Sequence, residues 1–415
     1  MWQVVATTIV VRVSVMICDP INLLDGFPRL NPPVVFVYNA STFKFYDGIS
    51  KERLLMNRFL MIDVGAGTMD ILYVDMESGA QYKAVVASPV RTIASSIEKT
   101  PGNLLVTGCE MGGGPVSQVL IRRAGESRVV MSAPAAATLH HDLEKVRSWN
   151  IEVVEDEKVT HYQKKRSFSH VTLGDLEPAR LDRIVKGFGV PFKFDVVCFC
   201  AQDHGIPPTG ESHLDFRHRK FRARLDRHPF PHILLFEKDE IPEELNRLRS
   251  AALVASTLPT QEIYVMDSGM AAILGASTDL ACTGKKRLLV MDVATSHTVV
   301  GALENGEIAG IVEYHTHDLT RDRLEELIVD LSDGRLSHEA ILEEGGHGAY
   351  IRKPFGYANG EILLATGPKR ELIGGSKLPI VWGAPLGDNM MTGTAGLLQA
   401  VCRRKHLDMR PSSSP

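Results

Sequence analysis

Two aspartates stand where an apolar run gives way to a tight turn of small residues. Asp63 opens the turn Val64 to Thr68, and Asp292 opens a turn that runs from Val293 to His297 after an apolar run of the same length. Glycine lets a backbone approach an anion closely and point its N–H groups at it. An aspartate at a strand end can hold Mg²⁺ through water. The pattern predicts two β-hairpins that face each other and clamp the phosphates of a nucleotide.

The strands that must carry these turns are visible as apolar runs. They predict two three-stranded meanders of matching length, at 59–63, 69–75 and 81–87 and again at 287–293, 298–303 and 307–314. A repeated plan of this kind implies gene duplication. We therefore expect two α/β lobes with a cleft between them.

The repeat also sets the expected domain boundaries. The first lobe is expected over 56–258, with a long loop at 202–230 that is rich in His, Arg, Pro and Gly. Residues 150–170 are polar and are expected to form a surface excursion. The second lobe is expected over 259–404, followed by a polar tail at 405–415.

Residues 1–55 show no clear periodicity before the first hairpin. Either Met56 is the native start and 1–55 is translated upstream sequence, or this segment is an N-terminal extension packed on the fold. Its first apolar stretch is interrupted by Arg12 and is short for a membrane-spanning helix, which needs about 20 residues.

The length, composition and net charge narrow the type of protein and the compartment in which it works. A chain of 415 residues can hold two or more domains, and 44% hydrophobic with 23% charged residues is typical of a globular protein in solution. The net charge of −4 gives no general attraction to nucleic acid or to anionic membranes. Six scattered cysteines do not form a disulfide framework and suit a reducing compartment. We therefore expect a cytoplasmic protein without nucleic-acid or membrane partners.

The order of five motifs resembles the actin, Hsp70 and sugar-kinase superfamily of ATP-binding proteins. The motifs are DVGAGTMD at 63–70, VMDSGMAAILGA at 265–276, LLVMDVATSHTVVGAL at 288–303, ILLATGPKRELI at 362–373 and PLGDNMMTGTAGLLQAV at 385–401. They correspond to two phosphate motifs, two connecting helices and an adenosine motif. The resemblance implies two duplicated actin-like, ribonuclease H-like lobes with a nucleotide cleft between them.

The resemblance also implies a role for single positions, with ATP and Mg²⁺ as cofactors. Asp63 would hold Mg²⁺ through water, Asp292 would orient or deprotonate the attacking nucleophile, and Asp267 would position the attacking water or hydroxyl. The other positions would contact ATP itself: Gly65, Gly67 and Thr68 around the β- and γ-phosphates, Thr295 and Ser296 as further phosphate donors, and Gly367 against the adenosine.

One departure concerns the second turn. Ala294 stands where the superfamily has glycine, and its Cβ could block the close approach of a phosphate. The hydroxyls of Thr295 and Ser296 could donate instead. Alternatively, this half of the protein kept its hairpin and lost its ligand.

More narrowly, four segments resemble a family found in archaea and bacteria, often labelled as similar to the pyruvate formate-lyase activating enzyme. The segments are QDHGIPPTGESHLDFR at 202–217, EEGGHGAYI at 343–351, TGPKREL at 366–372 and APLGDNMMTG at 384–393. A radical enzyme of that kind needs a CxxxCxxC triad for its cluster, and the sequence has no such spacing. Cys198 and Cys200 lie on a predicted buried strand, where they act either as small hydrophobic residues or as metal ligands.

Candidates for substrate binding follow the strand at 194–199. Asp203, His204 and Arg217 form either a substrate-binding loop or a solvated one. His347 lies between two glycines, which allows close approach of a ligand. With His315 and His317 it forms either a metal site or a group of surface histidines.

Three functions are compatible with these features. The first is a phosphotransferase or ATPase that acts on an unidentified small molecule. The second is an ATP-driven activator or assembly factor for a partner enzyme, for which Cys109 and Cys282 are the candidates to bridge a cluster between subunits. The third is a ligand-binding protein without turnover, in which Ala294 marks a degenerate phosphate loop.

Overall fold

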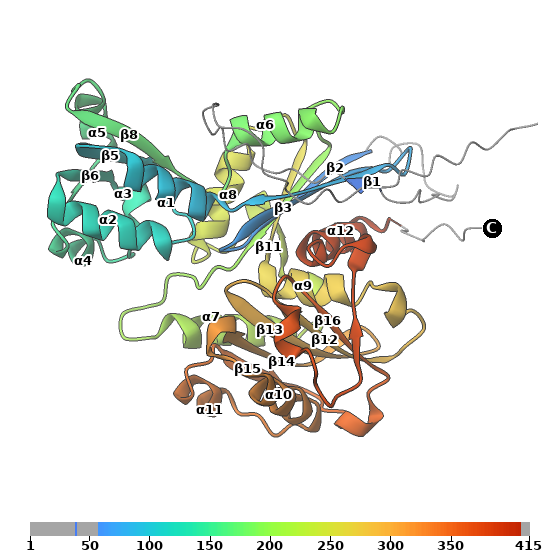
Figure 1. Ribbon diagram of the computed structural model, residues 1–415. Helices are drawn as coiled ribbons and strands as arrows, with labels where there is room; N and C mark the ends of the chain where they lie inside the picture. The colour runs from blue at the N-terminus through green and yellow to red at the C-terminus, as the bar shows by residue number, and fades with distance from the viewer. Residues whose placement is uncertain (1–37, 40–56, 408–415) are drawn as a thin grey trace, which may run out of the picture. The chain divides into compact units, whose positions relative to one another are not determined.

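The computed structural model describes residues 38–39 and 57–407 (Figure 1). The expectations for residues 1–55, for Met56 as the start and for the tail beyond residue 407 lie outside these residues. Within the described part of the chain, no helix combines the length and apolar character that crossing a membrane requires.

The first large sheet contains seven strands in the order β1-β4-β3-β2-β9-β11-β10. Strands β2, β3 and β4 form the antiparallel meander expected from the sequence, and β9 and β11 add to it in parallel. The strands are β1 Tyr38–Asn39, β2 Arg58–Val64, β3 Thr68–Asp75, β4 Gln81–Ala87, β9 Val196–Ala201, β10 Leu235–Glu237 and β11 Glu262–Asp267.

The second large sheet repeats this plan in the order β15-β14-β13-β12-β16-β17. Strands β12, β13 and β14 form the second antiparallel meander, and β16 and β17 follow in parallel. The strands are β12 Arg287–Val293, β13 His297–Glu304, β14 Glu307–His315, β15 Gly348–Ile351, β16 Ile362–Thr366 and β17 Ile380–Trp382. Two sheets with the same meander and the same parallel additions confirm the duplicated actin-like fold.

One predicted boundary was wrong. The second lobe was expected to begin at residue 259, but β11 pairs in parallel with β9 and belongs to the first sheet. A buried apolar strand pairs wherever a parallel edge is open, and its sequence does not say which sheet provides that edge. The second sheet therefore begins with β12.

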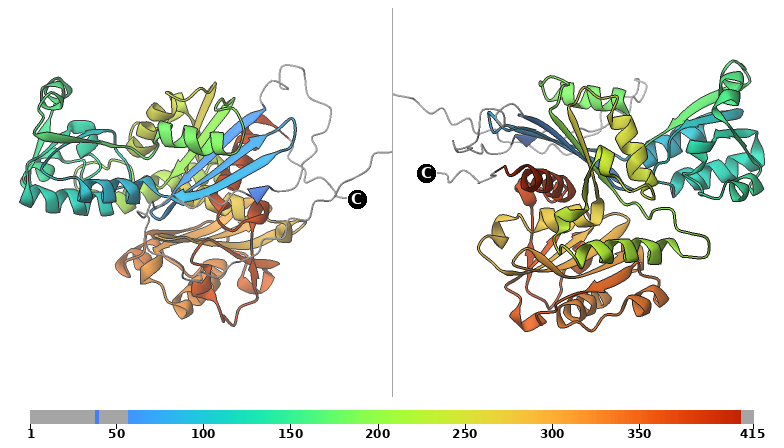
Figure 2. Two further views of the ribbon diagram at one scale, coloured as in Figure 1. Left: turned by 45° about the horizontal axis from the view of Figure 1, so that its top comes forward. Right: turned by 180° about the vertical axis from the view of Figure 1, so that it is seen from behind.

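A third, four-stranded sheet lies within the first half of the chain, in the order β7-β6-β5-β8 (Figure 2). It has its own apolar core, which includes Val106, Leu120 and Met131. The predicted surface excursion at 150–170 was wrong, because this segment contributes two strands and a helix to the sheet. The elements are β5 Asn103–Gly108, β6 Val129–Ser132, β7 Ile151–Val154, β8 Phe168–Leu173, α1 Pro89–Lys99, α2 Pro115–Glu126, α3 Ala133–Ala136, α4 Leu143–Ser148 and α5 Asp156–Gln163.

The predicted long loop at 202–230 also needs correction, because it contains helix α7, His213–Leu225. The hydroxyl of Ser212 caps this helix by accepting from the N–H of Asp215 at 3.1 Å. Charged residues dominate the segment and hide the helical period, since only Phe216, Arg217 and Leu225 are buried. The remaining α-helices are α6 Pro178–Gly187, α8 Asn246–Ala255, α10 Arg321–Asp333 and α11 His338–Glu343.

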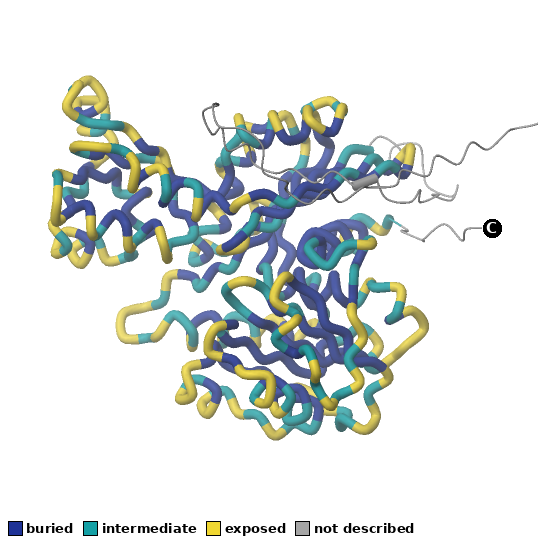
Figure 3. The backbone as a smooth tube through the Cα atoms, viewed as in Figure 1, coloured by how far each residue is buried: buried dark blue, intermediate teal, exposed yellow. Residues whose placement is uncertain are grey.

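Two helices, α9 (Ser268–Ala276) and α12 (Thr392–Lys405), pack directly on each other and lie side by side in Figure 1. Both are buried along most of their length (Figure 3). A Cβ at Gly275 would overlap the carbonyl oxygen of Thr392, and a Cβ at Gly396 would overlap that of Ala271. Glycine at these positions allows the backbones to approach closely, as the small residues of the two connecting-helix motifs predict.

Gly396→Ala is expected to lower the free energy of unfolding by about 3 kcal/mol, because the added methyl must push two backbones apart. Urea unfolding followed by circular dichroism measures this. Gly125→Ala is the matched control, since this glycine lies in α2 with open space around its Cβ position, and the change should stabilise by about 0.5–1 kcal/mol. Equal effects of the two changes would contradict the close helix contact.

Candidate functional site

The two turns that follow Asp63 and Asp292 have the same backbone hydrogen bond. The N–H of Gly65 donates to the carbonyl of Thr68 at 3.0 Å, and the N–H of Ala294 donates to that of His297 at 3.1 Å. A Cβ built on Gly65 would lie 3.6 Å from the carbonyl oxygen of Thr68, which is an ordinary contact. The turn therefore accommodates alanine, and the second copy keeps its conformation despite Ala294.

The turns also contact each other. A Cβ on Gly67 would lie 2.7 Å from Oγ1 of Thr295, so the first turn leaves room for a side chain of the second. The hairpins thus face each other, as the repeat predicts. Any side chain at position 67 would displace Thr295.

Three carboxyl groups meet at these turns, of which Asp70 is buried and Asp63 and Asp292 are partly buried. Asp63 and Asp70 are directly opposed on β2 and β3, and Asp292 ends β12. Burial raises the pKa of Asp63 to about 7, although a hydrogen bond from Cys200 acts to lower it. The charge of Asp292 adds to the rise. Burial also raises the pKa of Asp292 to about 6.

Burial and the neighbouring charge of Asp63 raise the pKa of Asp70 well above its usual value. Its buried Oδ1 atom has no hydrogen-bond partner among the described residues. Carboxylate oxygens are the ligands that Mg²⁺ prefers. A divalent cation would offset the repulsion between these carboxylates, so the residues present fit Mg²⁺.

The first turn of α12 lies on Asp63. A Cβ on Gly393 would overlap the carboxylate of Asp63, and no side chain caps this end of the helix. The uncapped N–H groups of a helix start carry partial positive charge and attract anions. On the opposite side, Oγ1 of Thr366 donates to Oδ1 of Asp292 at 2.9 Å and orients that carboxyl group.

A cavity of about 690 Å³ opens at the two turns, which is the usual size of a small-molecule site. Ten of the predicted site residues line it: Asp63, Gly65, Gly67, Thr68, Asp203, His204, Asp292, Thr295, Ser296 and His347. Three do not line it: Arg217, Asp267 and Gly367. The structure thus brings most of the predicted residues of both halves to one cavity.

Arg217 and Asp267 form a buried ion pair instead. Nη2 of Arg217 lies 2.8 Å from Oδ2 of Asp267, and Nη1 lies 2.8 Å from Oε2 of Glu313 on β14. Oδ1 of Asp267 also caps α9 by accepting from the N–H of Met270 at 3.1 Å. Both residues therefore hold elements around the cavity together and do not line it.

Gly367 is required by the backbone. Its φ of +93° is left-handed, and a Cβ there would lie 2.5 Å from the carbonyl oxygen of Val293 and 2.8 Å from Oδ1 of Asp292. The end of β16 therefore passes directly against the second turn. Its neighbour Pro368 lines the cavity.

Asp203 lines the cavity but its oxygens are already bonded within the protein. Oδ1 accepts from the N–H of Gly205 at 2.8 Å, and Oδ2 accepts from the N–H of Leu248 at 3.0 Å. Burial raises the pKa of Asp203 to about 6. Asp203 therefore shapes the segment that carries His204.

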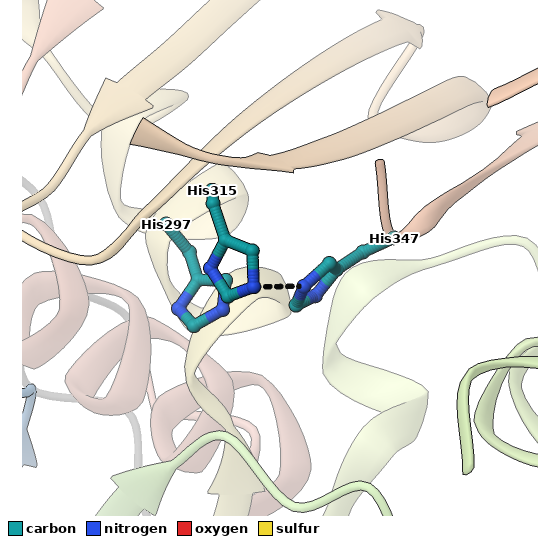
Figure 4. A group of neighbouring side chains, drawn as sticks. All are labelled: His297, His315 and His347. Carbon is teal, nitrogen blue, oxygen red and sulfur yellow. Dashed lines mark hydrogen bonds between the residues drawn. The ribbon is translucent and has the colours of Figure 1, made fainter. Parts of the chain in front are cut away.

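Histidine is concentrated around the cavity. The histidines on the second sheet that line it are His297, His315 and His347, and Figure 4 shows their rings converging. Nε2 of His347 lies 3.1 Å from Nε2 of His315. Of the histidines that the sequence left open as a metal site or a surface group, His317 has an exposed side chain, whereas His297 lies close to His315 and His347. The signal in the sequence was the hairpin itself, which pairs His297 with His315.

The first half of the chain contributes residues that the sequence interpretation missed. Glu110, His141 and Arg247 line the cavity, and Oε1 of Glu110 lies 3.0 Å from Nε2 of His141. This hydrogen bond raises the pKa of His141. Arg247 is held by Asp175, with Nε 2.7 Å from Oδ2. These residues are far apart in the sequence and follow no motif.

Comparison with solved structures gives distant likenesses. One is the ethanolamine utilization protein EutJ from Carboxydothermus hydrogenoformans, at 11% identity and a TM-score of 0.30, covering 83% of this chain and 92% of that one. Another is a ROK family transcriptional regulator, a homolog of the E. coli MLC protein, at 11% identity and a TM-score of 0.28, covering 84% and 79%. A third is the PilM-PilN type IV pilus biogenesis complex, at 14% identity and a TM-score of 0.28, covering 55% and 87%.

No curated protein matches the chain. The strand order of the two sheets and the paired helices α9 and α12 define the actin-like fold of this chain. A family model matches residues 111–372, which include the second hairpin, helix α7 and all three histidines of the second sheet. Because this match covers more than half of the sequence, the chain belongs to the family described as "Putative pyruvate format-lyase activating enzyme (DUF1786)".

Proposed function

We propose that this protein binds ATP with Mg²⁺ in the cavity and transfers or hydrolyses the terminal phosphoryl group, with an unidentified small molecule as the acceptor. The observation that carries the proposal is the meeting of Asp63, Asp70 and Asp292 at two turns with the same hydrogen bond. Buried carboxylates destabilise a fold unless a cation or a proton offsets their charge.

The residues around the two turns would have two tasks, to hold Mg²⁺ and to hold the phosphates. Asp63 and Asp70 would hold Mg²⁺, and this ion neutralises phosphate charge when bound. The N–H groups of the first turn and of the start of α12, with the hydroxyls of Thr295 and Ser296, would hold the phosphates. Catalysis of phosphoryl transfer consists mainly of such positioning and charge neutralisation.

Asp292 would orient and deprotonate the attacking hydroxyl or water. It lies at the end of the second hairpin and is oriented by Thr366. Burial raises its pKa to about 6, which suits a base that works near neutral pH. His204 and His347 line the same cavity and would contact the acceptor.

Asp292→Asn is expected to lower the basal Mg²⁺-ATPase rate of the full chain by roughly 10²–10³-fold, while the Kd for Mg²⁺-ATP changes by less than a few-fold. Single-turnover phosphate release and calorimetry measure the two quantities. Asp322→Asn is the control, because this exposed carboxylate lies on α10 away from the cavity lining. An unchanged rate in Asp292→Asn would contradict its role as base.

Among the described residues, no suitable pair of thiols supports the alternative role of activating a partner enzyme through a cluster held between subunits. Cys282 was expected in an exposed loop but is buried, and burial raises its pKa to about 12. Cys109 is partly buried, and burial raises its pKa to about 11. A thiol must be accessible and deprotonated to bind iron. We therefore favour phosphoryl transfer, and the family's description as an activating enzyme is not carried over to this chain.

A further inference from the structure

The geometry points to a transition-metal site formed by His297, His315 and His347, which would bind a divalent ion such as Zn²⁺ or Fe²⁺ with open positions toward the cavity. This site is separate from the proposed Mg²⁺ site in its ligands. It does not depend on nucleotide binding, because it rests on imidazole nitrogen and not on carboxylate oxygen.

Two of the three rings lie on neighbouring strands of one sheet, and the third lies directly before the next strand. His297 begins β13 and is paired in register with His315, which ends β14. His347 directly precedes β15, and its N–H donates to the carbonyl of Glu313 on β14 at 2.8 Å. One ligand nitrogen from each ring lies within 4.8 Å of the other two. The sheet therefore delivers all three imidazoles to one point (Figure 4).

The spacing is close to that of ligands on one ion. The Nε2 atoms of His315 and His347 are 3.1 Å apart. Two nitrogens at about 2.0–2.1 Å from a tetrahedral ion lie about 3.4 Å from each other. The ligand atom of His297 lies within 4.8 Å of those of the other two rings, which is close enough for side-chain rotation to complete the set.

The ring nitrogens lack protein partners that would explain their burial. Among the described residues, Nε2 of His297, Nδ1 of His315 and Nδ1 of His347 are buried without a hydrogen bond. Buried polar atoms are normally paired. The Nε2 atoms of His315 and His347 bond only to each other. The unbonded Nδ1 atoms of these two rings can carry the proton of the neutral imidazole, which leaves each Nε2 lone pair free for a metal ion.

The surroundings of His347 match those of a metal ligand. Oε1 of Glu313 lies 3.7 Å from Nδ1 of His347, on the side of the ring away from His315. Glu313 is itself held by Arg217 at 2.8 Å and by Gln202. A carboxylate behind a histidine ligand commonly fixes the ring and strengthens it as a donor.

The flanking glycines fix the position of the His347 backbone. Gly348 has a φ of +107°, and a Cβ there would overlap the ring of His338. A Cβ on Gly346 would lie 2.6 Å from Ile341 and 2.7 Å from the ring of Tyr314. The chain therefore packs tightly on both sides of His347. This rigidity holds its ring toward His315.

The ligand set indicates both the metal and its use. Imidazole suits Zn²⁺, Fe²⁺, Ni²⁺ and Cu²⁺, whereas Mg²⁺ prefers oxygen. Three protein ligands leave positions open, as in catalytic metal sites. All three rings line the cavity beside the second turn. An oxygen of a bound substrate or a water would occupy the open position.

The test uses the full chain, stripped with a chelator and dialysed against Zn²⁺ or Co²⁺. With excess Mg²⁺ present to occupy the carboxylate group, we expect one Zn²⁺ or Co²⁺ ion per chain by mass spectrometry of the metal content, and a visible Co²⁺ spectrum of nitrogen ligation. Each of His297→Ala, His315→Ala and His347→Ala should weaken binding by roughly tenfold or more. Circular dichroism establishes that each variant is folded, and His297→Asn provides a milder change at the hairpin turn.

Three controls separate this site from others. His317→Ala removes an exposed neighbour, and His228→Ala removes an exposed histidine that does not line the cavity. Asp63→Asn removes a member of the carboxylate group. All three should bind Zn²⁺ like the wild type. Retained Zn²⁺ binding in a variant that combines His297→Ala, His315→Ala and His347→Ala would overturn the proposal. So would the absence of a bound ion in the wild type.

Discussion

Asp63→Asn is expected to abolish binding of Mg²⁺-ATP and, at the same time, to stabilise the ligand-free protein. Asn cannot offset the charge of Mg²⁺, so the ion and the phosphates that it holds should both be lost. In the ligand-free state the same change removes a buried charge. Burial raises the pKa of Asp63 to about 7, so its charged form is unfavourable in the folded protein.

The sign and pH range of the stability effect follow from this shift. A carboxyl group with a raised pKa in the folded state lowers stability as the pH rises above about 4, and the full loss is reached above about 7. A shift from 3.8 to about 7 corresponds to about 4 kcal/mol at most, and the amide oxygen accepts a weaker hydrogen bond from Cys200 than the carboxylate does. We expect Asp63→Asn to gain about 1–3 kcal/mol at pH 8 and almost nothing at pH 4.

Urea unfolding at both pH values, without Mg²⁺, measures the gain. The exposed Asp322→Asn is the matched control and should change neither stability nor binding. A variant that is destabilised at pH 8 would show that Asp63 is a structural residue with satisfied partners. A variant that still binds Mg²⁺-ATP would exclude Asp63 as the cation ligand.

Arg217→Met should lower the free energy of unfolding by about 3–5 kcal/mol, the usual cost of breaking a buried ion pair on one side. The guanidinium joins Asp267 at the end of β11 to Glu313 on β14, and so connects the two large sheets. Burial opposes ionisation of Glu313, yet Arg217 holds its pKa well below the usual value. Methionine would leave two buried carboxylates without a cation.

A second change on the same helix provides the control. Arg219 pairs with Glu211 but its side chain is about half exposed, so Arg219→Met should cost no more than about 1 kcal/mol. Adding Glu313→Gln to Arg217→Met should recover part of the lost stability, because one unpaired charge is removed. Equal costs for the two arginines would contradict the buried triad.

The sequence predicts the two meanders because each strand is an apolar run of regular length, and β4 matches its expected range of 81–87. It misses elements whose periodicity is hidden by charge, such as α7 in the segment 202–230. It also assigns β11 to the wrong lobe, because strand pairing is decided by the open edge of a sheet and not by the strand.

For the candidate site, the two turns were predictable because a duplicated motif marks them. The group of three histidines was not, since His297, His315 and His347 meet only through the register of β13, β14 and β15. Arg217 was predicted to bind substrate and Asp267 to position the attacking water or hydroxyl, but in the structure the two form a buried ion pair with each other. Their contribution to the cavity is structural.

Calorimetric titration of ATP into the full chain, with and without Mg²⁺, shows whether the cavity binds Mg²⁺-ATP. We expect one site per chain, binding that requires Mg²⁺, and loss of the heat signal in Asp63→Ala with the folded state retained. The absence of binding to the wild type at millimolar ATP and Mg²⁺ would contradict the proposed function.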